Sequence, residues 1–246
     1  ILKNFSDQRI KYYKTNKFLK LGEVRKLGWE FCNGKYIAIL DADDIADPER
    51  LEKQIEFFNN NNDVAVYGSS LDIINNDGMF VERVNCSTDP DILKEEIVFS
   101  FPFMNSTLMI NKKIGDQLGG LDPNYEIIHD HEFVYRISKK FKISNSDKVF
   151  SKWRKHEKNI SWQKMLNGQL ELSKLLQIIS KDIKNKELLA INTNARALNS
   201  FKISYLSLKK LKFINSLLFF IRTFYIKPNI LFDKKIMNKI QIKLFN

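Results

Sequence analysis

Three carboxyl groups occur within four residues, Asp41-Ala42-Asp43-Asp44, directly after the apolar run Tyr36–Leu40. Carboxylates this close repel one another unless a positive group lies among them. On an extended chain Asp41 and Asp43 share a face, about 6.5 Å apart along the strand. Such a pair suits a hard divalent cation that also holds substrate phosphates. The alternative is an acidic strand-to-helix turn with an Asp at the helix N-cap.

Two later segments carry further polar groups with chemical potential. His129-Asp130-His131-Glu132 lies at the start of a predicted helix, where backbone N–H groups and the helix dipole favour a carboxylate. Arg154 and His156 precede Asn159-Ile160-Ser161. A two-His metal site at 129 and 131 is not expected, because residues i and i+2 do not share a helix face. These segments could converge on one cleft. It would hold an acidic pair for a metal, an isolated acid as a base, and an Arg with a His.

The elements that position these residues follow from apolar periodicity and turn signals. Alternating strands and helices predict an α/β fold with a mostly parallel sheet flanked by helices, and open sheets of this kind bind ligands at the carboxyl ends of their strands. The turn Asn75–Gly78 predicts an added antiparallel hairpin. Strands are predicted at 9–13, 35–40, 64–74, 79–84 and 106–110, two short ones before Trp153, and helices at 22–32, 48–59, 90–98, before Gly119-Gly120 and at 131–141.

Composition divides the chain near residue 162. The 246 residues are 43% hydrophobic and 12% aromatic, as expected for a folded protein. Residues 1–161 hold 24 basic and 25 acidic side chains, whereas residues 162–246 hold 16 basic and 4 acidic ones. The sequence therefore predicts an α/β domain over 1–161 and a basic helical region over 162–246. Such a charge asymmetry indicates contact with an anionic surface, either membrane or nucleic acid.

The helical region has two interpretations. Apolar residues are interleaved there with basic ones. The apolar residues are at positions 208, 211, 213, 217, 220 and 224, and the basic residues are at positions 209, 210, 212 and 222. This pattern is typical of an interfacial helix on anionic lipid, which would make residues 201–246 a membrane contact. It is equally typical of a helical cap packed on the α/β domain, which is slightly preferred. The apolar stretch Leu217–Ile221 is too short and too close to Arg222 to span a bilayer.

The cysteine spacing and the N-terminal residues limit the cellular compartment and the classes of cofactor that we expect. Cys32 and Cys86 form no Cys-x-x-Cys spacing, which argues against a disulfide framework and a zinc cluster and favours a reducing compartment. Ile1–Asn4 shows no signal-peptide pattern. A cytoplasmic protein, peripheral at the inner face of the membrane, is expected. Nucleic-acid binding is not expected, because no reading motif occurs and the acidic cluster repels phosphates without a metal.

Taken in order, these segments resemble family 2 glycosyltransferases of the GT-A fold. Lys35–Asp44 with Pro48-Glu49-Arg50-Leu51 resembles the metal-binding segment of that family. The resemblance covers residues 1–161. The other matching segments are Ser6–Tyr12, Asn16–Gly28, Gly119-Gly120-Leu121-Asp122, His129–Phe133 and Arg154–Ser161.

The resemblance implies a nucleotide-diphospho-sugar transferase that uses Mn²⁺ or Mg²⁺. It assigns the metal to Asp41, Asp43 and His156, and the donor nucleotide to Arg25, Asp41 and Arg154. Asp130 matches the base that deprotonates a hydroxyl of a glycan, lipid or protein acceptor. A single base with in-line attack implies inversion at the anomeric carbon.

Some family positions differ here. Lys26 stands where the family usually has Asn, Asn105 stands where many members have His, and His129 stands where the family usually has Glu. The strand, helix and strand that open the family, with their nucleotide-binding loop, are expected to be absent from this chain. The alternative function is therefore a non-catalytic remnant or a carbohydrate-binding partner.

Overall fold

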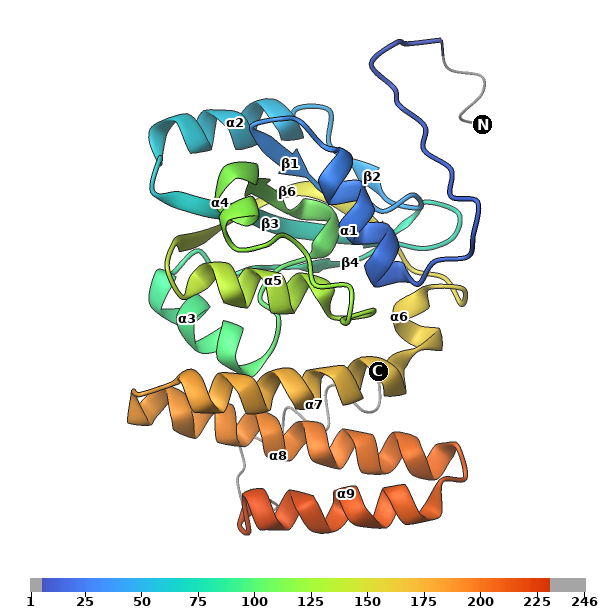
Figure 1. Cartoon of the computed structure of the whole chain (residues 1–246), viewed down its shortest axis with the longest axis vertical. Helices are drawn as coiled ribbons and strands as arrows, with labels where there is room; N and C mark the ends of the chain where they lie inside the picture. Colours follow the sequence, from blue (N-terminus) through green and yellow to red (C-terminus); the bar gives the residue numbers. More distant parts are fainter. Residues whose placement is uncertain (1–5, 231–246) are drawn as a thin grey trace.

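The computed structural model of this chain describes residues 6–230 (Figure 1). The α/β part lies above the stacked long helices of residues 165–226. The strands are β1 (Tyr36–Ala38), β2 (Ile45–Ala46), β3 (Val64–Ile74), β4 (Phe80–Val84), β5 (Met109–Asn111) and β6 (Lys142–Arg154). The helices are α1 (Leu21–Phe31), α2 (Arg50–Asn60), α3 (Pro90–Phe99), α4 (Lys112–Gln117), α5 (His129–Ser138), α6 (Ile160–Gln163), α7 (Met165–Asp182), α8 (Lys186–Lys209) and α9 (Phe213–Ile226).

The predicted α/β fold with flanking helices and a helical C-terminal region is confirmed, but its sheet is mixed rather than mostly parallel. The strand order is β1-β5-β3-β6-β2, and β4 pairs with β3. Only β3 and β6 pair in parallel among the described strands, from Val64 opposite Lys142 to Ile74 opposite Arg154. The other pairings are antiparallel. β5 and β2 have three and two residues, and strands this short carry no sequence signal for their direction.

Two local predictions were wrong in detail. Residues 9–13 form no strand, because nothing in the described part of the chain pairs with them; Tyr12 is 65% exposed. An isolated strand has no partner for its backbone N–H and C=O groups. Tyr13 instead stacks on Phe31 of α1, with ring centroids 4.1 Å apart. The two short strands expected before Trp153 are one long strand, β6.

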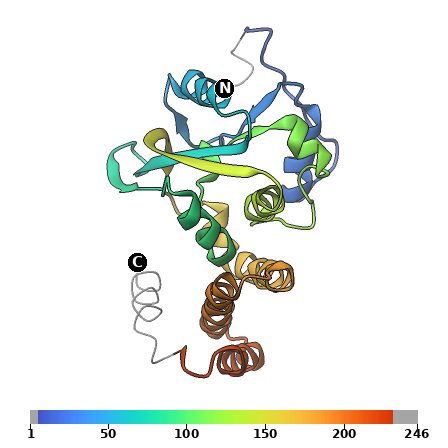
Figure 2. The same ribbon diagram turned by 90° about the vertical axis from the view of Figure 1, so that its left-hand side faces the viewer.

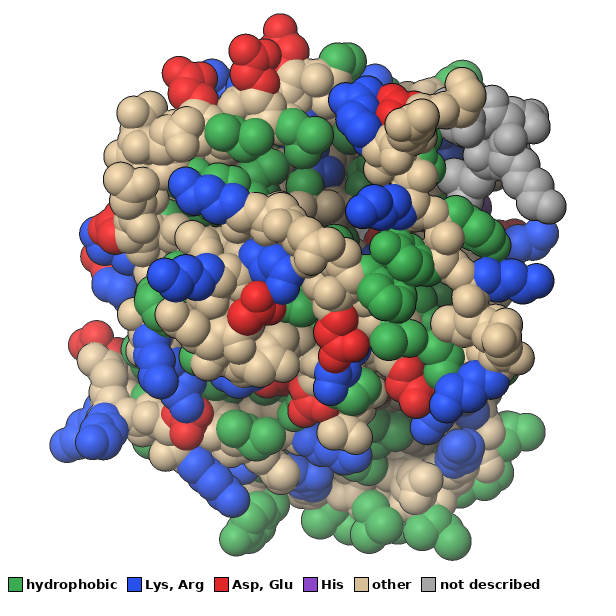
Figure 3. Space-filling view, turned by 45° about the horizontal axis from the view of Figure 1, so that its top comes forward, with side chains coloured by type: hydrophobic (Ala, Val, Ile, Leu, Met, Phe, Trp, Pro, Cys, Tyr) green, Lys and Arg blue, Asp and Glu red, His purple; other side chains and the backbone are tan. Residues whose placement is uncertain are grey.

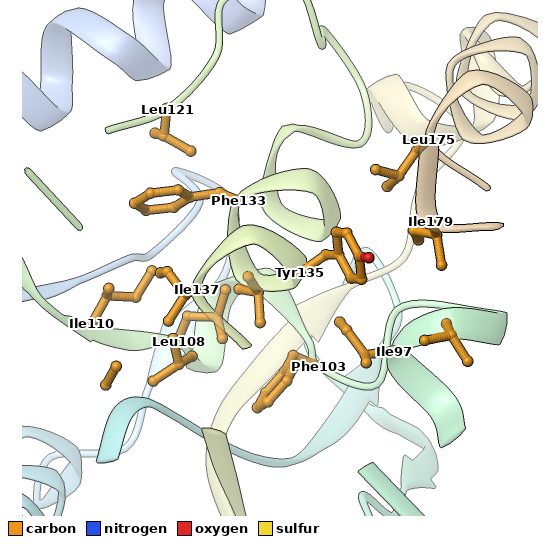
Figure 4. Close-up of a cluster of buried hydrophobic side chains, with 14 of the residues drawn as sticks. Ile97, Phe103, Leu108, Ile110, Leu121, Phe133, Tyr135, Ile137, Leu175 and Ile179 are labelled. Atoms are coloured by element: carbon orange, nitrogen blue, oxygen red, sulfur yellow. The ribbon is translucent and has the colours of Figure 1, made fainter. Parts of the chain in front are cut away.

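The core is continuous from the sheet into the helical region. Leu108 and Ile110 pack with Phe133 of α5 in one buried cluster, and Leu175 and Ile179 of α7 belong to the same cluster (Figure 4). The architecture changes from α/β to helical near the predicted boundary at 162. The apolar packing does not stop there, so α7 supports the α/β part from below.

The outer helices pack through α8. Asn192 of α8 donates to the carbonyl oxygen of Val98 at the end of α3, at 3.0 Å. α9 lies against α8, where Ser200 and Ser204 donate to the carbonyl oxygens of Phe219 and Ser216 (Figure 2). Within residues 6–230 no helix is both long enough and apolar enough to cross a membrane.

Candidate active site

A cleft of about 630 Å³ lies where β1 ends and brings together segments far apart in sequence. It is bounded by α1, the loop after β1, the turn Asn105–Thr107, the start of α5 and the segment after β6. The cleft-lining residues from the predicted site are Arg25, Asp41, Asp43 and Asp130, joined by Asp44, Asn105 and Asn159.

Asp41 is held by a cation and an amide. Nη2 of Arg25 in α1 donates to its Oδ1 in a short ion pair. Nδ2 of Asn105 lies 3.2 Å from Oδ2 of Asp41. The backbone N–H of Asp41 donates to Oγ of Ser106. Nε of Arg25 is buried without a hydrogen-bond partner in the described part of the chain. Arg25 therefore supplies the positive charge that the close carboxylates require.

Asp43 has one occupied and one open carboxylate oxygen. Nε2 of His156 lies 2.8 Å from Oδ2, and Nδ2 of Asn159 lies 3.4 Å from the same atom. Among residues 6–230 no side chain or backbone group bonds Oδ1, and the Asp43 side chain is 39% exposed. Oδ1 is thus available to a ligand in the cleft.

Asp44 joins the acidic loop to β6. Its Oδ1 accepts the backbone N–H of Arg154 at 2.9 Å, and its Oδ2 accepts the hydroxyl of Ser106. Burial raises the pKa of this carboxyl, against the lowering effect of both hydrogen bonds. Glu49 occupies the N-cap of α2, so Asp44 is not the cap of that helix.

Arg154 does not line the cleft. Its guanidinium donates to the carbonyl oxygens of Asp43, Asn75 and Asn76, at 3.0, 3.3 and 2.9 Å. It therefore clamps the acidic loop to the turn between β3 and β4. Its predicted contact with the donor stays a prediction.

Asp130 occupies the first turn of α5, and its Oδ1 accepts the N–H of His131 at 2.8 Å. The loop before α5 is tied to the helical region by Glu171 of α7. The Glu171 carboxylate accepts the backbone N–H groups of Glu126, Ile127 and Ile128, at 3.1, 2.9 and 3.2 Å. The backbone next to Asp130 is thereby fixed by a residue from outside the α/β part.

Sequence reasoning missed Glu171. It lies more than 40 residues beyond Asp130, in a region predicted as a basic appendage. One signal was present, because it is one of only four acidic residues after position 161. An isolated Asp or Glu in a strongly basic segment is a candidate for a specific hydrogen bond.

The described residues offer few protein ligands for a metal. In the part of the chain that the structure describes, no three His, Cys, Asp or Glu side chains are grouped to hold an ion. Mg²⁺ commonly takes one or two carboxylates and completes its shell with water and substrate phosphates. The open oxygen of Asp43 in a wide cleft fits that second arrangement.

Residues 1–114 match the profile of glycosyl transferase family 2. The chain is similar to this family over that segment, which is a little less than half of its length. An uncharacterized glycosyltransferase of Methanocaldococcus jannaschii is 29% identical over 168 residues, which cover 61% of this chain and 57% of the relative. The UDP-Glc:alpha-D-GlcNAc-diphosphoundecaprenol beta-1,3-glucosyltransferase of Escherichia coli is 40% identical over 76 residues, 30% of this chain and 29% of that one. The chain thus spans less than two thirds of either relative.

Solved structures share the fold. S. aureus TarS matches with a TM-score of 0.54 and 14% identity, over 86% of this chain and 62% of TarS. A mannosyltransferase from Pyrobaculum calidifontis, in complex with GDP-Man and Mn²⁺, matches with a TM-score of 0.50 and 12% identity. That match covers 80% of this chain and 52% of the other. The resemblance to family 2 glycosyltransferases that the sequence indicated is confirmed over residues 1–114.

Proposed function

We propose that this protein transfers a sugar from a nucleotide-diphosphate donor to a hydroxyl of a glycan, lipid or protein acceptor, with inversion and with Mn²⁺ or Mg²⁺. One observation carries the proposal: a single cleft holds the acidic pair Asp41/Asp43 and a separate carboxylate, Asp130. Glycosyl transfer needs both a group that stabilises the leaving diphosphate and a base for the acceptor. The E. coli relative is named for transfer from UDP-Glc, and the P. calidifontis protein was solved with GDP-Man and Mn²⁺.

The donor side of the reaction falls to the acidic loop. Asp43, with Asp41 beside it and with His156 orienting its carboxylate, would hold a divalent cation, which supplies Lewis-acid stabilisation of the departing diphosphate. Arg25 pairs with Asp41 in the cleft, where both would contact the donor. Arg154 supports the loop that carries Asp43.

The acceptor side falls to Asp130. Its carboxylate takes the proton of the acceptor hydroxyl as that oxygen attacks the anomeric carbon. The bond from the anomeric carbon to the phosphate oxygen breaks, and its electron pair leaves with the nucleoside diphosphate. A single in-line displacement inverts the anomeric centre.

The test is the substitution Asp130→Asn, with Asp147→Asn on the exposed surface of β6 as a matched control. We expect Asp130→Asn to lower transfer by about 10²–10⁴-fold, the usual contribution of a general base, with donor affinity unchanged. Asp147→Asn should retain full activity. Full turnover by Asp130→Asn would reject the assignment. A purely carbohydrate-binding protein would bind sugar and consume no donor in any variant.

We also propose that the basic helical region contacts an anionic membrane surface at the inner face. Residues 162–246 carry 16 basic and 4 acidic side chains, which supports an anionic partner. This contact would bring the cleft close to a lipid-linked acceptor.

A further inference from the structure

The outward side of α9 is apolar and uncovered by the described part of the chain. Ile214, Leu218, Ile221 and Tyr225 recur at a helical spacing and are 77%, 59%, 57% and 88% exposed. Thr223 is the one residue that α9 buries fully. Hydrophobic side chains gather along the lower edge of the molecule, where α9 lies (Figure 3). Contiguous exposed apolar faces of this kind mark protein or membrane contacts.

The charge around this face has one sign. Residues 188–230 contain seven Lys or Arg and no Asp or Glu. Lys209, Lys210 and Lys212 are all exposed just before α9 begins. A protein partner for this surface would need to be acidic, whereas a lipid surface offers anionic headgroups above an apolar layer.

A pocket of about 430 Å³ lies at the edge of the apolar face, between α7, α8 and α9. We call it the arginine pocket; it is lined by Gln177, Thr193, Arg196, Arg222, Tyr225 and Ile226. Arg222 follows Leu218 by four residues, so it lies beside the exposed apolar row.

The two arginines of this pocket lack an anionic partner within residues 6–230. Burial, and then the charge of Arg222, lower the pKa of Arg196. Nε of Arg196 is buried without a hydrogen-bond partner, and neither arginine forms an ion pair with any carboxylate of residues 6–230. Two guanidinium groups so close repel each other, and a bound anion would relieve that repulsion. Their planar forks suit the oxygens of a phosphate group.

We propose that the arginine pocket binds the phosphate of an anionic phospholipid while the apolar face of α9 lies in the membrane interface. A free phosphate would explain the arginines but not the adjoining apolar row, so lipid is the occupant that accounts for both. The inference deepens the membrane contact proposed above and is independent of the transfer reaction.

The test is sedimentation of the full chain with vesicles of phosphatidylcholine alone or with 30% phosphatidylglycerol. We expect binding to the anionic vesicles only, and at least a tenfold weaker binding for Arg196→Gln/Arg222→Gln, because each basic side chain near an anionic surface contributes about 1 kcal/mol. The control Lys113→Gln/Lys152→Gln removes two exposed charges from the α/β part and should change binding less than threefold. Ile214→Ser/Ile221→Ser should weaken binding while leaving both arginines in place.

Inorganic phosphate serves as the second probe. Binding of phosphate that requires both arginines, combined with equal affinity for neutral and anionic vesicles, would assign the pocket to a free anion and overturn the proposal. Wild-type affinity of the double arginine variant for anionic vesicles would also overturn it. Far-ultraviolet circular dichroism of each variant identifies any that fail to fold, and the Ile214→Ser/Ile221→Ser pair then tests the same contact.

Discussion

The neighbours of Asp43 restrict what its carboxylate can do. Nδ1 of His156 accepts the backbone N–H of Lys158 at 3.2 Å, so Nε2 carries the proton of the neutral ring and donates to Asp43. A direct bond from Nε2 to a metal would require the other tautomer and the loss of both hydrogen bonds. In the described arrangement His156 orients the carboxylate and leaves its second oxygen open.

His131 makes stability depend on pH. Its ring is 2% exposed, bonds the carbonyl oxygen of Ile97 at 2.9 Å and stacks on Phe101. Burial lowers its pKa below 6.5 in the folded protein. Below pH 6.5 the unfolded chain therefore takes up a proton that the folded chain does not, and stability falls as pH falls.

We predict that His131→Gln removes this contribution. Urea unfolding of both proteins between pH 7 and 5 should give a wild-type curve that falls more steeply, by at most about 1.4 kcal/mol per pH unit for one proton. At pH 7 the variant should be the less stable, because His131 packs in the core. Parallel curves across this range would contradict the assignment.

At the residue scale, four of the six side chains that sequence patterns selected line the cleft, namely Arg25, Asp41, Asp43 and Asp130, whereas Arg154 and His156 do not. The sequence patterns did not predict where each side chain points. Arg154 donates to three backbone carbonyl oxygens. Every residue carries such an oxygen, so the residue types did not indicate these contacts. The roles of these residues remain proposals.

At the element scale, α1 owes its position to a glycine. A Cβ at Gly22 would lie 2.6 Å from the carbonyl oxygen of Tyr125 and 2.7 Å from that of Pro123, both backbone atoms. The start of α1 therefore packs directly on the loop before α5, and this contact sets the position of Arg25.

We predict that Gly22→Ala costs about 1–3 kcal/mol of stability, as overpacking does, and weakens donor binding by moving Arg25. Gly28→Ala lies in the same helix with no atom within 4 Å of its Cβ. It should instead gain up to about 1 kcal/mol from helix propensity. Urea unfolding measures both, and similar effects of the two substitutions would contradict the close contact at Gly22.

α7 acts on α5 through Glu171. We predict that Glu171→Gln lowers kcat and leaves the donor dissociation constant unchanged, because the three N–H bonds hold the loop that leads to Asp130. The loss in stability should be at most about 1–3 kcal/mol, because these N–H donors are only partly buried and the Gln side chain keeps one oxygen that can accept a hydrogen bond. Glu95→Gln on the exposed side of α3 is the control. An unchanged kcat in Glu171→Gln would exclude the positioning role.

Elements with strong periodicity were predicted closely, and β3 has the predicted bounds 64–74. All of its residues are buried, and apolar residues at both of its ends, Val64–Tyr67 and Ile73-Ile74, mark its bounds. The direction of β5 was not predictable, since a three-residue strand gives no pattern and its place between β1 and β3 depends on distant residues. Residues 9–13 have strand composition without a neighbouring strand in residues 6–230.

At the scale of the whole molecule, the helical region is part of the folding unit. Leu175, Leu176 and Ile179 of α7 share a core cluster with Ile97 of α3 and Phe133 of α5. Tyr135 of α5 and Lys139, which follows α5, also bond Asp182 at the end of α7. The change in charge and periodicity near 162 predicted a boundary there, but it carried no information about this shared packing. The cleft and its supporting helices should therefore unfold together.

The most direct measurement of the central claim is Mn²⁺ binding to the full chain, followed by electron paramagnetic resonance, with UDP, GDP or dTDP present. The account predicts one Mn²⁺ per chain with at least one of these nucleotides. Asp43→Asn should weaken that binding at least tenfold, whereas Asp77→Asn in the exposed turn after β3 should not. Absence of nucleotide-dependent Mn²⁺ binding, or equal affinity in wild type and Asp43→Asn, would contradict the account.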